Sequence, residues 1–273
     1  MEFVSYKNKR VVITGCFSGM GEAATRLLLD LGAEVHGLDY KDCRLPLASF
    51  NHVDLREPAS IDAAAAKITG RVDALFNCAG LPQTFAPLDV MKANFLGARR
   101  LTEDLLPLMG EGSAIASISS TAGLRWSTRM QVSMELINSG SFEAGVKWCE
   151  AHMETVAEGY SLSKEALIVW TLLNAAPLIK RGIRINCILP GPTQTPMMDS
   201  FESATPKAVL DAAAQPINRR SLPSEQAGPL VFLNSDAASY ISGVALPVDG
   251  GFMGSLATGQ IDLGAMMGAA AAG

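Results

Sequence analysis

The stretch that decides the fold of this chain is Thr14-Gly15-Cys16-Phe17-Ser18-Gly19-Met20-Gly21, which follows the apolar run Arg10-Val-Val-Ile13. The run predicts a short strand, and the apolar spacing over 22–31 predicts a helix after the glycines. Glycines let the backbone approach a pyrophosphate, and the first turn of a helix offers it free N–H groups. By itself the octapeptide also fits a plain glycine turn. As a strand–turn–helix unit it predicts a dinucleotide site.

Further apolar runs alternate with stretches of helical spacing. They lie at Glu34–Asp39, 72–77, Ala114–Ile118 and 183–189. Strands separated by helices need crossover connections, which produce a parallel sheet with helices on both faces. We therefore predict an α/β fold, a single-domain Rossmann-type doubly wound sheet over 1–253. Residues 254–273 are expected to form a C-terminal tail.

Composition excludes several function classes. The 273 residues carry 22 Lys and Arg against 27 Asp and Glu, a net charge of −5, so no nucleic-acid partner is expected. No apolar run reaches the roughly 18 residues of a membrane span, because Asn174 and Pro177 interrupt the nearest candidate, and no secretory signal begins the chain. Five scattered cysteines and three distant histidines predict reduced thiols, a cytoplasmic location and no metal site.

An acidic residue closes the second predicted strand. Asp39 follows Gly21 at about the 20-residue distance typical of a ribose-binding acid. Its carboxylate would accept a hydrogen bond from the adenosine 2′-hydroxyl and repel a 2′-phosphate, and Cys16 and Phe17 supply no arginine to offset that. A surface aspartate after a strand is also common. The position favours NAD over NADP.

A tyrosine and a lysine stand four residues apart in Tyr160-Ser-Leu-Ser-Lys164. On a helix this spacing puts both side chains on one face. A free phenol has a pKa near ~10, and a neighbouring cation favours the phenolate that accepts a proton. Alone, the pair would also fit a solvated helix face.

These motifs, with others in the same order, resemble the short-chain dehydrogenase/reductase family from about Lys9 to Gly251. The octapeptide matches the family's T-G-x-x-x-G-x-G, residues 77–80 its N-N-A-G, and residues 160–164 its Y-x-x-x-K. Residues 190–197 resemble its P-G-x-x-x-T segment, and 248–251 its closing motif. Cys78 replaces the second asparagine of N-N-A-G, which puts one sheet-stabilising hydrogen bond in doubt.

The resemblance implies a role for each matching residue. Tyr160 would exchange the proton of the alcohol, Lys164 would lower the pKa of Tyr160 and hold the nicotinamide ribose, and Ser120 would donate to the substrate oxygen. Asn94 would hold a proton-relaying water. The alternative, purely structural roles are helix capping for Ser120 and a helix kink at Asn94. The implied NAD contacts are Gly15, Ser18, Gly19, Met20, Gly21, Asp39, Asp54 (at the adenine), Leu55, Asn77, Ala79, Gly80, Tyr160, Lys164, Pro190, Gly191, and Thr193 and Thr195 (at the carboxamide).

Two departures point to one branch of the family. Residues 121–159 separate the serine from the tyrosine, where the family usually has about a dozen, so an insertion lies at about 125–156. The segment from Asp39 to Asp54 is too short for the usual helix. Both features resemble the 3α-hydroxysteroid dehydrogenase/carbonyl reductase branch. We expect large soft side chains to line an apolar substrate pocket, namely Trp126, Met134, Met197, Met198 and Phe201. Alternatively, the insertion packs onto the body or forms a subunit contact.

The resemblance thus implies an NAD-dependent enzyme that interconverts a secondary alcohol and a ketone on an apolar, alicyclic or steroid-like substrate, as a homo-oligomer (tetramer or dimer). A 3-oxoacyl-carrier reductase-like enzyme is one alternative, but it would more often use NADP and carry basic residues near the entrance. A non-catalytic NAD-binding sensor is another, but it would tolerate loss of Ser120, Tyr160 or Lys164, and all three are present.

Overall fold

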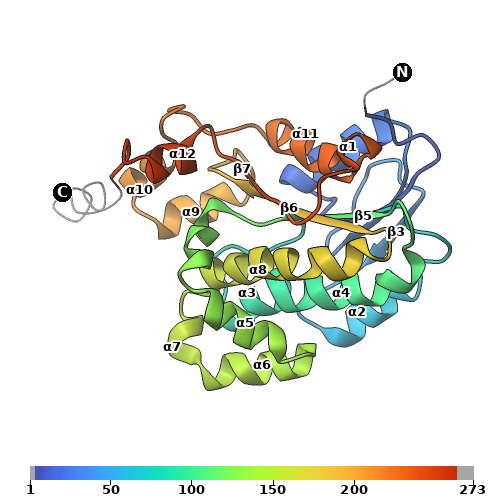
Figure 1. Ribbon diagram of the computed structural model, residues 1–273, viewed down its shortest axis with the longest axis horizontal. Helices are drawn as coiled ribbons and strands as arrows, with labels where there is room; N and C mark the ends of the chain where they lie inside the picture. Colours follow the sequence, from blue (N-terminus) through green and yellow to red (C-terminus); the bar gives the residue numbers. More distant parts are fainter. Residues whose placement is uncertain (1–3, 263–273) are drawn as a thin grey trace.

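The strands of this protein form one parallel sheet, seen edge-on in the middle of Figure 1. The computed structural model describes residues 4–262. Across the sheet the strand order is β3-β2-β1-β4-β5-β6-β7. The strands are β1 Arg10–Thr14, β2 Glu34–Asp39, β3 Ser49–His52, β4 Ala74–Asn77, β5 Ala114–Ile118, β6 Arg184–Pro190 and β7 Ala245–Val248.

The chain reverses its direction across the sheet at β1, which pairs with β2 on one side and β4 on the other. The register puts Thr14 opposite both Leu38 and Asn77. In open α/β sheets, ligands bind beyond the carboxyl ends of the strands at such a switch point. The sheet therefore places the glycine-rich turn where a dinucleotide site is expected.

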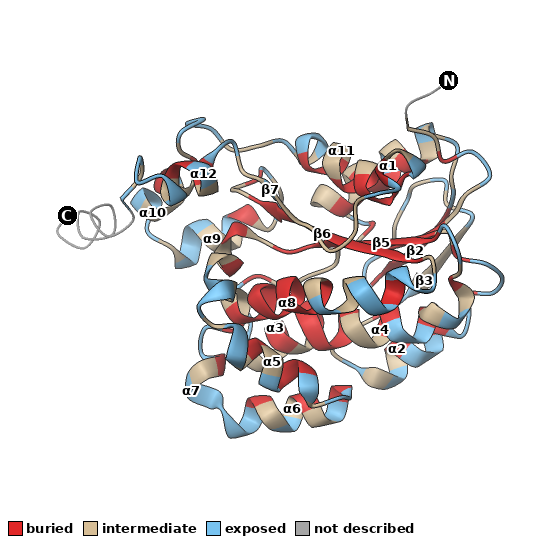
Figure 2. Cartoon of the chain, in the orientation of Figure 1, coloured by how far each residue is buried: buried red, intermediate tan, exposed pale blue. Residues whose placement is uncertain are grey.

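Helices cover both faces of the sheet (Figures 1 and 2). On one face α1 (Gly19–Asp30) packs against α11 (Pro223–Asn234) over one buried apolar cluster. A second buried cluster lies on the other face, and side chains of the helices there contribute to it. Those helices are α2 (Pro58–Ala65), α3 (Pro87–Met91), α4 (Ala98–Leu105) and α8 (Gly159–Ile179). The predicted doubly wound α/β fold is confirmed.

The insertion forms three helices of its own. After a 3₁₀ turn, η3 (Thr121–Ser127), come α5 (Met130–Asn138), α6 (Phe142–Ala151) and α7 (Met153–Val156). Helix α5 packs on α8, and α6 packs on α3 and on the π-helical turn η1 (Lys92–Gly97). No helix stands between β2 and β3 in residues 40–48, as the short spacing predicted.

The remaining short elements lie mostly near the carboxyl end of β6 and after it. They are η2 (Leu106–Leu108), α9 (Met198–Ala204), α10 (Lys207–Ala213), η4 (Asp236–Ala238) and α12 (Phe252–Ala257). The predicted tail begins inside α12, and its residues 263–273 lie outside the described part of the chain.

Helix α8 is the described helix that is long and apolar enough to cross a membrane. Asn174 and Pro177 interrupt its apolar sequence but not the helix itself. Most of its apolar stretch is buried inside the fold (Figure 2), as in the core helix of a globular protein.

Candidate active site

Tyr160 and Lys164 lie on the first turns of α8, against the carboxyl end of β5. The Lys164 Nζ donates to the carbonyl oxygen of Ile118, the last residue of β5, at 2.9 Å. The Ser119 hydroxyl donates to the Lys164 carbonyl oxygen at 2.9 Å. These bonds fix α8 to the strand end that carries Ser120. Burial lowers the pKa of Lys164 to about 8.

The phenol of Tyr160 is hydrogen-bonded to Ser120, and this bond lowers its pKa. Burial acts in the opposite direction and is the larger effect, so the net pKa of Tyr160 is raised to about 12. The Lys164 Nζ lies 5.5 Å from the centre of the Tyr160 ring. The sequence predicts a pKa lowered by the lysine; here desolvation of the phenolate outweighs any such effect.

Asn94 stands in the π-helical turn η1, a type of turn found frequently at functional sites. Its Oδ1 accepts from the backbone N–H of Leu81 at 2.6 Å, and its Nδ2 donates to the Leu81 carbonyl and to the Ser163 hydroxyl. Gly80 allows this approach, because a Cβ there would lie 3.2 Å from Asn94 Oδ1 and 3.8 Å from Lys164 Nζ. The amide thus joins the loop after β4 to α8.

The glycine-rich turn packs tightly against the end of β4. Gly15 has φ +76°, and a Cβ there would lie 2.7 Å from the backbone nitrogen of Ala79, while a Cβ on Gly21 would collide with the Gly15 carbonyl. The Thr14 hydroxyl accepts from the backbone N–H groups of Cys78 and Ala79 at 3.0 and 3.1 Å. The cysteine therefore keeps its backbone bond to β1, and burial raises the pKa of its thiol.

The two predicted acids differ in their surroundings. Asp39 is buried, and its two oxygens accept the backbone N–H groups of Phe17 and Lys41, each at 3.0 Å. This places it beside the glycine-rich turn. Asp54 is paired with Arg56 through both oxygens, which lowers the pKa of the carboxyl. The side chain of Leu55 is part of the buried core.

A cavity of about 280 Å³ brings many of the predicted residues together. Its lining includes nine predicted catalytic and cofactor residues, Met20, Gly80, Ser120, Tyr160, Lys164, Pro190, Gly191, Thr193 and Thr195. The predicted substrate residues Met197, Met198 and Phe201 line the same cavity. The ring of Phe201 meets that of Tyr160 edge-on, with centroids 5.0 Å apart at 75°. The Tyr160 phenol thus stands between a polar end and an apolar wall.

Trp126 and Met134 are placed elsewhere. Both are partly buried and pack against the core cluster beneath the sheet, and neither lines the cavity. The expectation that they line the substrate pocket is therefore wrong for this structure. Met134 lies on α5, which packs against α8, so the alternative in which the insertion packs onto the body describes its position.

Sequence reasoning missed part of the apolar wall. Val209, Leu210 and Ala213 on α10 line the cavity, as does Phe252 on α12. The helical spacing of 209, 210 and 213 was the available signal. A helix of seven residues is too short for periodicity to indicate which neighbour it faces.

The residues of the switch point fit a dinucleotide. Ser18 begins α1 without a side-chain cap bond, so its hydroxyl and the first N–H groups of the helix lie together. Asn77 is directed into the sheet instead, donating to Thr102 and Ser117, and its Oδ1 is buried without a partner among the described residues. The Thr193 hydroxyl bonds to the Gly191 carbonyl and to Ser221.

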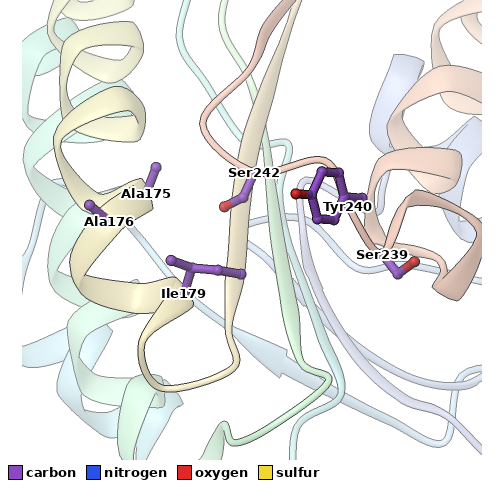
Figure 3. A pocket seen from close by; sticks show the side chains of 6 residues that line it. All are labelled: Ala175, Ala176, Ile179, Ser239, Tyr240 and Ser242. Atoms are coloured by element: carbon purple, nitrogen blue, oxygen red, sulfur yellow. The ribbon is translucent and has the colours of Figure 1, made fainter.

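A second hollow lies at the other end of α8 (Figure 3). It is lined by Ala175, Ala176, Ile179, Ser239, Tyr240 and Ser242. Among the residues that the structure describes, no carboxylate, lysine or histidine lines it, so its serines and Tyr240 have no lysine beside them as Tyr160 has.

Comparison with known proteins agrees with this geometry. The family model described as short chain dehydrogenase matches residues 9–132, and the model described as enoyl-(acyl carrier protein) reductase matches residues 146–253. The chain is 36% identical over 245 residues to coniferyl-alcohol dehydrogenase of Pseudomonas sp. strain HR199, covering 89% of this chain and 96% of that protein. It is 32% identical to 3-alpha-hydroxysteroid dehydrogenase/carbonyl reductase of Comamonas testosteroni, covering 88% and 95%.

A solved structure is similar over nearly the same length. The 3-alpha-hydroxysteroid dehydrogenase from Pseudomonas sp. B-0831, complexed with NADH, superposes with a TM-score of 0.79 at 27% identity. The match covers 92% of this chain and 99% of that one.

Proposed function

We propose that this chain, which belongs to the short-chain dehydrogenase/reductase family, is an NAD-dependent enzyme. It would interconvert a secondary alcohol and a ketone on an apolar, alicyclic or steroid-like substrate. The two relatives compared above are named as dehydrogenases of an alcohol and of hydroxysteroids. The observation that carries the proposal is one cavity with Ser120, Tyr160 and Lys164 at one end and an apolar wall at the other.

In alcohol oxidation Tyr160 takes the hydroxyl proton while Ser120 donates to the substrate oxygen, and in ketone reduction Tyr160 gives the proton back while Ser120 keeps the same hydrogen bond. The hydrogen bond from Ser120 stabilises the phenolate, and Lys164 stands 5.5 Å from the Tyr160 ring. Burial opposes the phenolate, so the site needs positive charge nearby to work near neutral pH. The nicotinamide, when bound, supplies that charge in its oxidised form and is the hydride acceptor.

The chain's own residues would hold NAD at the switch point. Gly15, Gly19 and Gly21 with the start of α1 would hold the pyrophosphate, and Asp39 the adenosine ribose. Thr193 and Thr195 would hold the carboxamide, and Lys164 the nicotinamide ribose. Asp54 and Leu55 at the adenine, Asn77, Ala79 and Gly80 beside the nicotinamide, and Asn94 on the proton path complete the proposed set.

A carrier-bound substrate is the second candidate, since the family model over 146–253 is described as an enoyl-(acyl carrier protein) reductase. The lining of the cavity favours the first candidate, the enzyme that acts on an apolar alcohol or ketone. Lys164 is the one charged side chain on it, and the remainder of the wall around Phe201 is apolar.

We further propose a cytoplasmic homo-oligomer, a tetramer ahead of a dimer. Tyr240 is fully exposed next to the hollow of Figure 3, and Ile179 beside it is half exposed, as apolar surface in a subunit contact would be. A single-chain mass in light scattering at micromolar concentration would contradict this assembly.

The proposed activity is tested with purified protein, NAD and a panel of monocyclic, bicyclic and steroid alcohols, followed by the absorbance of the reduced cofactor. The expected kcat/KM with NAD exceeds that with NADP by at least ~10-fold, because Asp39 repels a 2′-phosphate. No turnover on any alcohol would refute the activity, and a preference for NADP would refute the role of Asp39.

A further inference from the structure

The cavity beside Tyr160 is closed on one side by α9 and α10, which we call the lid (residues 198–213). The lid is held by contacts at two points. The Gln83 Nε2, on the loop after β4, donates to the Thr205 hydroxyl at 2.6 Å, and Glu202 pairs with Arg220. Phe201 touches the ring of Tyr160. The cavity of about 280 Å³ is therefore the volume with the lid in place.

That volume limits how much of a substrate the cavity can enclose. A cavity of about 150 Å³ holds one benzene ring. The cavity here has about 280 Å³, or room for two six-membered rings. Met20, Gly191 and Thr195 line it, and these residues belong to the proposed cofactor site, so the nicotinamide ring must share the space. Room for one substrate ring remains.

The walls also restrict the charge of the substrate. The polar side chains gather on the side of β5 and β6, around Ser120, Tyr160 and Thr195. On the lid side the lining is Met198, Phe201, Val209, Leu210 and Ala213. A carboxylate or phosphate placed there would lose its hydration without gaining a partner, which is costly.

We propose that the enzyme takes neutral, single-ring alcohols and ketones, and that Phe201 sets this limit. The inference rests on the proposed function and narrows its substrate class, from alicyclic or steroid-like compounds to single rings at the same site. Phe201 is the side chain that decides the limit because it lies directly against Tyr160, at 5.0 Å between ring centroids.

The experiment compares kcat/KM for cyclohexanol, 2-decalol and a 3α-hydroxysteroid in the full-length enzyme. We expect cyclohexanol to exceed the four-ring alcohol by at least ~100-fold, since one misfitting methylene alone is worth about 10–200-fold. In Phe201→Ala the difference should shrink by at least ~10-fold. Tyr240→Ala, an aromatic truncation at the hollow of Figure 3, should leave the order unchanged. 4-Methylcyclohexanol should be used at least ~10-fold better than 4-hydroxycyclohexanecarboxylate.

A binding measurement separates this inference from the proposed function. Cyclohexanone and a steroid ketone are titrated by calorimetry into the enzyme with oxidised NAD, where no hydride can be transferred. Tighter binding of the single ring without turnover of any alcohol would support the size limit and refute the activity. Turnover of the steroid within ~10-fold of cyclohexanol, or an equal change for all substrates in Phe201→Ala, would overturn the size limit.

Discussion

Two segments of this chain carry large soft side chains, and only one of them lines the active-site cavity. The insertion helices α5 to α7 lie on one side of α8, and the lid helices α9 and α10 lie near its other side (Figure 1). Met134 of the insertion packs into the core, whereas Phe201 of the lid lies against Tyr160. Apolar composition shows that a segment has surface to bury, but not which neighbour buries it, because the insertion joins Ser120 to Tyr160 and still packs onto the core.

The two segments are also fastened differently. Arg125 and Arg129, on the insertion side, reach Glu158 and Glu165 of the catalytic helix region, and the Glu165 side chain is 0% exposed. The pair that holds the lid to the body, Glu202 and Arg220, has side chains that are 47% and 31% exposed. Buried charges must be paired, whereas exposed pairs are screened by water. The insertion should therefore act on stability and the lid on substrate choice.

The largest expected effect is at the residue between the two segments. Tyr160→Phe removes the hydroxyl and leaves the ring contact to Phe201 in place. Turnover should fall at least ~100-fold, because no other group on the cavity takes the alcohol proton as directly. NADH binding by fluorescence and the melting temperature should stay near wild type. Near-normal turnover would remove Tyr160 from the mechanism.

The ion pairs give the next largest effect. Arg129→Ala leaves the buried Glu165 with Arg125 at 3.6 Å as its remaining cation, so unfolding free energy should drop by about 2 kcal/mol. The matched lid variant, Glu202→Ala, which breaks the pair with Arg220, should change it by less than about 1 kcal/mol. Denaturant titration of both variants measures this. Equal losses would mean that the insertion is no more firmly attached than the lid.

Particular residues show which parts of the candidate site can be predicted from the sequence. The octapeptide at 14–21, Asp39, Ser120, Tyr160 and Lys164 were found because each stands in a local motif whose backbone geometry the motif itself specifies. The parallel, doubly wound sheet followed from alternating strands and helices, whereas the order of its strands did not. Nothing local separates Trp126 from Phe201, because both are apolar side chains on short turns and helices. The net pKa of Tyr160 also depends on burial by lid residues distant in sequence.

A smaller effect is expected from truncating apolar residues in each segment. Trp126→Ala should lower the free energy of unfolding by about 1–2 kcal/mol, since the side chain is partly buried against the core. It should leave the ratio of kcat/KM for bulky and small alcohols unchanged. Met198→Ala, which removes a lid side chain from the cavity lining, should alter that ratio instead. A changed ratio of kcat/KM for bulky and small alcohols in Trp126→Ala would mean that the insertion does line the substrate pocket.

The smallest expected effect is a shift in the pH dependence of alcohol oxidation. The kcat/KM of this reaction should rise with pH as Tyr160 loses its proton. Burial raises the pKa of Tyr160 and the Ser120 hydrogen bond lowers it. Ser120→Ala should therefore move the rising limb of kcat/KM to higher pH, and Phe201→Ala, which admits water to the phenolate, should move it to lower pH. Each shift should be below about one pH unit, or about 1.4 kcal/mol.

Trp126→Ala is the control for this measurement, because Trp126 does not line the cavity that borders Tyr160. The rising limb of kcat/KM against pH in Trp126→Ala should coincide with that of the wild type. The two opposite shifts distinguish an effect on the phenolate from a general loss of activity, which lowers the whole profile without moving it. A limb that moves the same way in all three variants would show that the phenol responds to global loosening, and the functional distinction between lid and insertion would fail.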